Sequence, residues 1–451
     1  MDAADLDYRA RTQSGCIPPH SVSRLLELGH ADEVELWAGH GEWFCARERA
    51  WLLGEEGRGA EALEILAPYL ATGWWTATRT AAELLESWGR ADEAIVLTRS
   101  RMEVGHPLAL EFFARLLARH DRSDEAFTLL KPHIDGWFLA VALVDVAEGA
   151  DREEEAAELL LARIPDQHRC DTPWCCRGLD PDMAIGLLAT IRERQGRIDE
   201  AITLLRTRDS TSVNGRDQLA DLLARHGRTG ELRAYAVTER LGYAAQRLAE
   251  LLEERGDVEG AIAVYRQAGD SSLRRGNTTV HLAHLLARHG RGDEAIEVMR
   301  ALSDRPGGAE DWILHVLCTL YTERGRPEDG LAHLDALAAA RGGEEDWDLF
   351  WIRLSLMAAC DRVDEAIERA RTHPEGGTSY AAPHIAELLA NTGRAEEAVA
   401  VLRSHAPANG HDLAGYLMDL GRTEDAVAVL HQDTPRPPQP STTVWSEDPP
   451  F

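Results

Sequence analysis

The sequence predicts an all-α protein, an α-solenoid of about thirteen stacked helix-turn-helix units. Three observations predict it. Residues 281–300, HLAHLLARHGRGDEAIEVMR, carry apolar residues at helical spacing on both sides of Gly290. Near-copies of this stretch recur from end to end of the chain. The residue seven positions before each turn is small in most copies, which lets two helices approach closely.

The stretch 281–300 defines the unit. Its first helix is expected to end at Gly290, because glycine adopts the left-handed conformation of a helix C-terminus without steric cost. Asp293 and Glu294 then open the second helix, where carboxylates favour the positive end of the helix dipole. Ala295, Ile296 and Met299 form its buried stripe.

The copies follow one another at spacings of 28 to 45 residues, counted between turn residues. After the first, degenerate copy, the position four after the turn is mostly acidic and the next one is mostly alanine. The predicted turn residues are Gly29, Gly57, Gly89, Asp121, Asp151, Gly196, Gly227, Gly256, Gly290, Gly325, Asp361, Gly393 and Gly421.

The pattern L-A-x-L-L-x-x-x-G-x-x-x-E-A-I, found over roughly residues 20–432, resembles the tetratricopeptide repeat. That resemblance implies stacked helical hairpins, a concave face lined by the first helices, and a protein or peptide as partner. The proline that the family usually carries at the end of its second helix is mostly absent here, and the spacing is irregular. We therefore expect stacked hairpins more than an evenly curved superhelix.

Five segments are expected: an N-terminal extension, 1–19; repeats over 20–164; an insertion loop, 165–180; repeats over 181–433; and a proline-rich tail, 434–451. Arg24 interrupts the apolar stripe of the first copy, which suggests a capping unit with one side in water. The tail favours an extended conformation, either disordered or docked in a groove.

The formal charge of −29 argues against nucleic acid as a partner, since phosphate recognition needs clustered Lys and Arg. The chain shows no signal peptide and no apolar run long enough to span a membrane, so we expect a cytoplasmic protein without a membrane partner. Its arginine-rich, lysine-poor composition suggests a high-GC actinobacterium. Self-association is left open.

No nucleotide-binding loop, H-E-x-x-H or G-x-S-x-G motif occurs, so the sequence predicts neither an enzyme nor a cofactor. The weak metal candidate is the set His168, Cys170, Cys175 and Cys176 in the insertion. The ligand types suit zinc, but adjacent cysteines rarely share one ion, and ordinary loop cysteines are the simpler interpretation. A metal-dependent enzyme centred on residues 165–180 is the least favoured alternative.

On the tetratricopeptide pattern, exposed positions of the concave face lie 13, 10 and 6 residues before each turn. Aromatic residues and arginines among polar groups suit a protein-binding surface, although packing between repeats explains aromatic residues at helical spacing equally simply. The candidate binding residues are Arg47, Trp51, Arg79, Glu83, Arg115, Asp217, Tyr243, His284, Trp312, His315 and Trp351.

Two other recurring residues have structural explanations. Trp43, Trp75, Trp137 and Trp347 all lie fourteen residues before their turn, which is typical of packing at the start of a helix. A histidine directly before three of the turns, at positions 120, 226 and 289, is interpreted as a cap on the negative helix end.

The sequence therefore predicts a non-enzymatic protein- or peptide-binding scaffold. Its groove would be more basic near Arg47, Arg79 and Arg115, whereas Asp217 and the acidic residues that follow it would favour a cationic ligand in the middle. The alternative is a ligand-responsive regulatory sensor. Residues 1–20 leave no room for a fused effector domain, so a sensor would act on a separate protein.

Overall fold

The computed structural model describes residues 2–103, 105–164, 179–208, 212–213, 216–271, 275–305, 310–340, 345–406 and 408–431. The chain forms two compact units. Unit 1 comprises residues 1–181 and 394–451, and unit 2 comprises residues 182–393. The last hairpins of the chain therefore belong to the same unit as the first.

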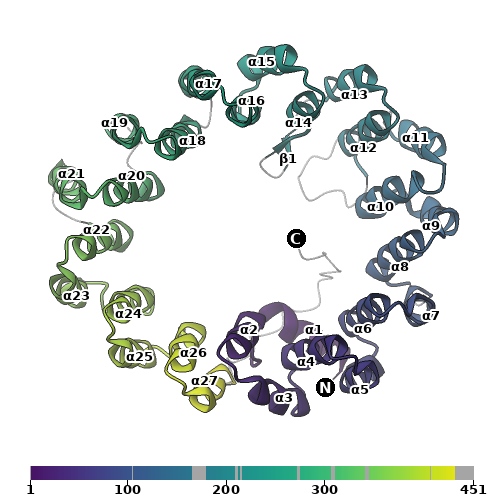
Figure 1. Ribbon diagram of the computed structural model, residues 1–451, viewed down its shortest axis with the longest axis horizontal. Helices are drawn as coiled ribbons and strands as arrows, with labels where there is room; N and C mark the ends of the chain where they lie inside the picture. The colour runs from purple at the N-terminus through teal and green to yellow at the C-terminus, as the bar shows by residue number, and fades with distance from the viewer. Residues whose placement is uncertain are drawn as a thin grey trace, which may run out of the picture. The chain divides into compact units, whose positions relative to one another are not determined.

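The described chain forms 27 α-helices, drawn in Figure 1. Those of unit 1 are α1 (Ala3–Thr12), α2 (Pro19–Glu27), α3 (Ala31–Gly39), α4 (Trp43–Glu55), α5 (Gly59–Ala71), α6 (Trp75–Ser87), α7 (Ala91–Met102), α8 (Pro107–Arg119), α9 (Ser123–Leu130), α10 (Trp137–Ala147), α11 (Glu153–Leu161), α25 (Ala395–Arg403), α26 (Gly410–Asp419) and α27 (Thr423–Leu430), with a short 3-10 helix over Lys131–His133.

Unit 2 continues the hairpins and adds one short β-ribbon. Its elements are α12 (Pro181–Arg194), α13 (Ile198–Leu205), β1 (Ser212–Val213), β2 (Arg216–Asp217), α14 (Gln218–Arg225), α15 (Thr229–Thr238), α16 (Tyr243–Glu254), α17 (Val258–Ser271), α18 (Arg275–Arg288), α19 (Gly292–Ser303), α20 (Asp311–Glu323), α21 (Pro327–Ala340), α22 (Trp347–Ala359), α23 (Val363–Thr372) and α24 (Ala382–Asn391).

The predicted all-α fold class is confirmed. After α1, the helices follow in thirteen pairs, and each predicted turn residue has a positive φ, including Asp121, Asp151 and Asp361. Aspartate tolerates this left-handed conformation better than most residues, because its short side chain can hydrogen-bond locally. The departure from an all-helical chain is the antiparallel β1–β2 ribbon, which pairs Ser212 with Asp217 and Val213 with Arg216.

Within each unit the first helix of a hairpin packs against the first helix of the next. In unit 1, α4 contacts α6 and α6 contacts α8; in unit 2, α14 contacts α16 and α20 contacts both α18 and α22. The small residues predicted at this contact are buried, among them Ala82, Ala114, Ala249 and Cys318. The first helices of neighbouring hairpins therefore share one face, as the repeat pattern predicts.

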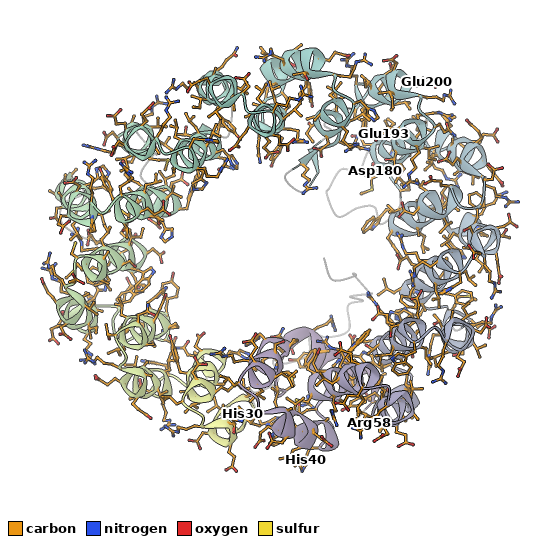
Figure 2. All side chains as sticks on the ribbon, in the orientation of Figure 1. His30, His40, Arg58, Asp180, Glu193 and Glu200 are labelled. Carbon is orange, nitrogen blue, oxygen red and sulfur yellow. The ribbon has the colours of Figure 1, made fainter. Side chains whose placement is uncertain are left out.

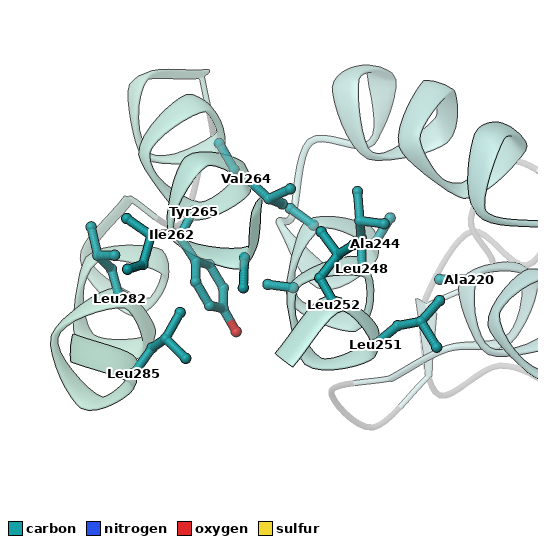
Figure 3. Close-up of a cluster of buried hydrophobic side chains, with 14 of the residues drawn as sticks. Ala220, Ala244, Leu248, Leu251, Leu252, Ile262, Val264, Tyr265, Leu282 and Leu285 are labelled. Carbon is teal, nitrogen blue, oxygen red and sulfur yellow. The ribbon is translucent and has the colours of Figure 1, made fainter. Parts of the chain in front are cut away.

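Figure 3 shows the core of unit 2, where apolar side chains from successive helices form a continuous cluster. Tyr265 of α17 lies among Leu248 of α16 and Leu282 and Leu285 of α18, and all four are buried. Such contacts between neighbours are the main source of stability in a repeat protein, because each hairpin buries its apolar face only against the next.

Much of the charge of the chain lies in ion pairs at the turns. The arginine after a turn pairs with the acidic residue three positions later, as Arg58 does with Glu61 at 2.6 Å and Arg197 with Glu200 at 2.5 Å. Figure 2 labels Arg58 and Glu200 at two such turns. Some of these arginines also reach the preceding hairpin, as Arg228 does to Asp199 at 2.7 Å. Part of the acidic composition is therefore structural.

His120 and His226 do lie at the C-terminal cap of their helices, and the imidazole Nε2 of His120, His226 and His289 also bonds a glutamate of the preceding hairpin, at 2.8–2.9 Å. One sequence interpretation needs correction. The first hairpin is not a cap with one side in water, because the Arg24 guanidinium donates to Asp419 of α26. Among the described helices, none is long and apolar enough to cross a membrane.

Candidate functional site

The candidate site is the first-helix face of unit 2, which we define as the surface made by positions 13, 10 and 6 before each turn on α14, α16, α18, α20 and α22. Three pockets formed by the described residues open on this face, and residues at these positions line all three. The repeat pattern alone predicts that these positions are exposed. The pockets differ in their chemistry.

A polar pocket of about 370 Å³ lies between α14 and α16 and is bordered by the β-ribbon. We call it the α14–α16 pocket. Two of the predicted site residues, Asp217 and Tyr243, line it. Its full lining is Arg216, Asp217, Asp221, Tyr243, Gln246, Arg247 and Glu250.

The carboxylates of Asp221 and Glu250 are the acidic groups that this pocket presents to a ligand. Arg247 Nε lies 3.3 Å from Asp221 Oδ1, and Arg247 NH1 lies 3.4 Å from Glu250 Oε2. Gln246 Nε2 donates to the other Glu250 oxygen at 2.9 Å. The arginine contacts are long for charge-assisted hydrogen bonds, which are typically about 2.7–2.9 Å. Because a carboxylate has about four acceptor sites, both groups retain capacity for a further donor.

Asp217 also lines this pocket, but its side chain stabilises the fold. Its side chain is buried, with a relative exposure of 3% for the residue. Oδ1 accepts from the backbone N–H of Ala220 at 2.9 Å and so caps the N-terminus of α14, while Oδ2 accepts from the Tyr235 hydroxyl at 2.8 Å. We therefore assign Asp217 a structural role and keep Asp221 and Glu250 as the candidate binding carboxylates of this pocket.

A second, less polar cavity runs along α18, α20 and α22. It consists of two pockets, of about 480 and 220 Å³, that share His315, Thr319 and Glu323 of α20. We call the pair the α18–α22 groove. His284 and Arg288 of α18 line one end. The predicted residues His284 and His315 thus lie in one groove, together with the exposed residue Thr319, which lies six residues before its turn but is not among the candidate binding residues.

The predicted tryptophans of unit 2 are partly used in packing. Trp312 is 41% exposed, donates from Nε1 to Glu310 at 2.7 Å and covers Gly276 of α18, where a Cβ would lie 3.0 Å from the indole. The Trp351 ring lies 4.6 Å from the ring of His384, measured between centroids. Both therefore offer only part of their surface to a ligand.

In unit 1 the predicted arginines already have acidic partners. Arg47 pairs with Glu48 at 2.6 Å, Arg79 with Glu83 at 2.8 Å, and Arg115 with Glu111 and with Asp145, the latter at 2.9 Å. Trp51 is half-buried. These pairs neutralise the basic sub-site that the sequence suggested, so the candidate site rests on unit 2.

The sequence analysis did not predict two arginines that line the α14–α16 pocket. Arg247 lies nine residues before its turn, outside the three exposed repeat positions. It could still have been predicted, because it lies between Tyr243 and Glu250 on the same helix face. Arg216 reaches the pocket from β2, an element that the helical repeat pattern does not predict.

No group of three or more His, Cys, Asp or Glu side chains suited to a metal ion occurs in the part of the chain that the structure describes. The candidate set His168, Cys170, Cys175 and Cys176 lies outside the described residues, as does the tail over 434–451. Both predictions therefore stay predictions.

Comparison with known families matches residues 242–342 to the family described as Tetratrico peptide repeat. Residues 242–342 are therefore similar to the tetratricopeptide repeat. The matched stretch contains α16, α18 and α20, whose exposed faces line the α14–α16 pocket and the α18–α22 groove. The resemblance inferred from the turn pattern is thus confirmed for this part of the chain.

The comparison with curated proteins gives no match. Among solved structures, 232 chains match. One is the structure of Naa15/Naa10 bound to HypK-THB, at 13% identity and a TM-score of 0.35, covering 85% of this chain and 74% of that chain. Another is a tetratricopeptide repeat protein from Parabacteroides merdae, at 15% identity and a TM-score of 0.29, covering 65% of this chain and 98% of that chain. Both scores are low, and neither likeness assigns a ligand.

Proposed function

We propose that this repeat protein is a non-enzymatic protein- or peptide-binding scaffold that uses the first-helix face of unit 2. The observation that carries the proposal is that all three pockets described on this face are lined by the positions that the repeat pattern marks as exposed. Several preformed pockets along one face suit an extended ligand, because each side chain can enter its own pocket without reorganising the scaffold.

The α14–α16 pocket is suited to a cationic side chain. Asp221 and Glu250 face the same cavity, and the bonds that they accept from Arg247 are long. A lysine or arginine of the ligand would supply shorter, charge-assisted hydrogen bonds to them. The α18–α22 groove offers His284, His315 and Thr319 as polar contacts beside apolar surface, which suits a neutral or amphipathic stretch of the same ligand.

A peptide-library measurement tests the proposal. The full-length protein is presented with peptides that carry lysine, arginine, glutamate or alanine at a fixed central position. We expect enrichment of the lysine and arginine peptides. The variant D221N/E250Q should bind the enriched peptides at least about tenfold more weakly, because charge-assisted hydrogen bonds contribute about 1.5–3 kcal/mol.

The matched control is Glu83→Gln on α6. Glu83 lies six residues before its turn, as Asp221 and Glu250 do, but it belongs to unit 1 and pairs with Arg79 at 2.8 Å. It should leave binding unchanged. Equal binding by all four peptide classes, or equal losses in both variants, would count against the α14–α16 pocket as a cation site.

The remaining sequence expectations concern cellular context. A cytoplasmic location, an actinobacterial source, and the absence of nucleic-acid and membrane partners stay predictions, as does any self-association.

A further inference from the structure

The two ends of the described chain meet inside unit 1. Helix α2 of the first hairpin packs beside α26 of the last, although residues 182–393 of unit 2 separate them in sequence. Figure 1 shows α2, α26 and α27 together. First helices of consecutive hairpins contact one another in the same way, so the last hairpin contacts the first as a sequence neighbour would.

The outer part of this junction is an exposed ion pair. The Arg24 guanidinium donates from Nε and NH2 to Asp419 Oδ1, at 2.9 and 2.7 Å, and also bonds Glu27 at 3.1 Å. The Arg24 and Asp419 side chains remain 44% and 46% exposed. Beside them, the rings of His20 and His411 lie 5.8 Å apart in an edge-to-face arrangement. Salt can therefore reach and screen the outer contacts.

The inner part is built around the buried carboxylate of Glu42, directly before α4. It accepts from His431 Nε2 at 2.9 Å, Arg9 NH2 at 3.1 Å and the backbone N–H of Ile17 at 3.3 Å. The His431 ring also lies 4.8 Å from the ring of Trp37. Burial alone would raise the pKa of Glu42, but the donors, His431 first among them, hold it below its usual value.

If the last hairpin were released, the Glu42 carboxylate would still have hydrogen-bond donors. Two of its three donors, Arg9 and Ile17, come from the N-terminal segment itself and stay in place when His431 leaves. A buried charge that keeps its partners costs far less than one left unpaired. The N-terminal segment can therefore keep its fold whether or not the last hairpin is bound to it.

We propose that α26–α27 together with His431 forms a detachable latch on the N-terminal segment of unit 1, closed by the Arg24–Asp419 and His431–Glu42 contacts. The first hairpin is a docking surface for the chain's own last hairpin. When the latch opens, α2, α3 and the Trp37 ring become more exposed, and α26–α27 separate from the rest of unit 1.

Hydrogen–deuterium exchange on the full chain tests the latch. The variants are Arg24→Glu, which reverses one charge, and R24E/D419R, which restores the pair with exchanged signs. For R24E we expect exchange to rise about fivefold in α2–α3 and in α26–α27 together, from loss of the pair and new repulsion. Exchange in α16–α20 should not change. R24E/D419R should return both segments to the wild-type rate.

Arg79→Glu is the matched control, since it reverses an exposed arginine that pairs within a single helix, and it should leave the latch segments unchanged. Faster exchange confined to α2 in R24E, or no recovery in R24E/D419R, overturns the proposal. A second pair of variants acts at the inner contact: His431→Ala should open the latch, whereas His431→Gln, which keeps an N–H donor, should not. Equal exchange in these two also overturns it.

Discussion

Three glutamates, Glu86, Glu193 and Glu253, each lie three residues before a turn and receive two donors from the next hairpin. Glu253, for example, binds Arg288 at 2.8 Å and His289 at 2.9 Å. Each contact joins the first helices of neighbouring hairpins at their C-terminal ends. A single glutamate thus links successive repeats, a role that the sequence of one repeat does not reveal.

Because of these glutamates, we expect the stability of the fold to fall at acid pH. The guanidiniums of Arg119 and Arg288 lower the pKa of Glu86 and Glu253. Burial opposes this shift at Glu193, but the donors from the next hairpin, Arg225 first among them, outweigh it and lower the pKa there too. A depressed carboxyl pKa stabilises the fold above the unfolded value, about 4.3, and this contribution is lost as the pH falls through the folded value.

The melting temperature of the wild type should therefore fall more steeply below pH about 4.3 than that of E86Q/E193Q/E253Q. The measurement is a thermal melt at a series of pH values between neutral and acidic. Parallel curves for the two proteins would show that the glutamates do not carry this dependence.

At the scale of the helices, glycines decide how closely neighbouring hairpins approach. The Trp88 indole, at the end of α6, lies against Gly54 of α4 and Gly59 of α5. A Cβ at Gly54 would lie 2.8 Å from its Nε1 and one at Gly59 would lie 3.0 Å from the ring. The two glycines of one hairpin thus receive the tryptophan of the next, and both lie within α-helices.

We predict that Gly54→Ala destabilises unit 1 by about 1–2 kcal/mol, because overpacking costs about 1–3 kcal/mol and outweighs the helix propensity gained. Gly230→Ala in α15 is the control, since a Cβ there meets no atom within 4 Å. It should stabilise by roughly 0.5–1 kcal/mol. Denaturant midpoints of both variants measure the effect, and a stabilised Gly54→Ala would contradict it.

Local chemistry explains which elements the sequence could predict. The thirteen turns were predictable because glycine or aspartate at a left-handed position, followed by Asp or Glu, is encoded within a few residues. The β1–β2 ribbon was not, because its pairing depends on the loop between α13 and α14 and lies outside the repeat. The position of Asp221 on the first-helix face was predictable from the repeat, whereas the structural role of Asp217 depends on Tyr235, eighteen residues away.

At the scale of the whole molecule, the chain begins and ends in unit 1. In the sequence, Arg24 interrupts the apolar stripe of the first hairpin and so indicated an end exposed to solvent. That prediction was wrong because the partner of Arg24, Asp419, lies 395 residues further along the chain. No repeat pattern links two such positions. Contacts between distant hairpins are thus the part of this fold that a repeat pattern cannot predict, and they give unit 1 non-local contacts that a simple linear array lacks.

We propose above all that the first-helix face of unit 2 binds a peptide with a cationic residue held by Asp221 and Glu250. A double-mutant cycle tests this binding mode. Kd is measured for a selected arginine peptide and its citrulline counterpart, against the wild type and D221N/E250Q. We predict a coupling of at least about 1.4 kcal/mol, a tenfold effect. If citrulline weakens binding equally to both proteins, the cation does not contact these carboxylates and the proposal is wrong.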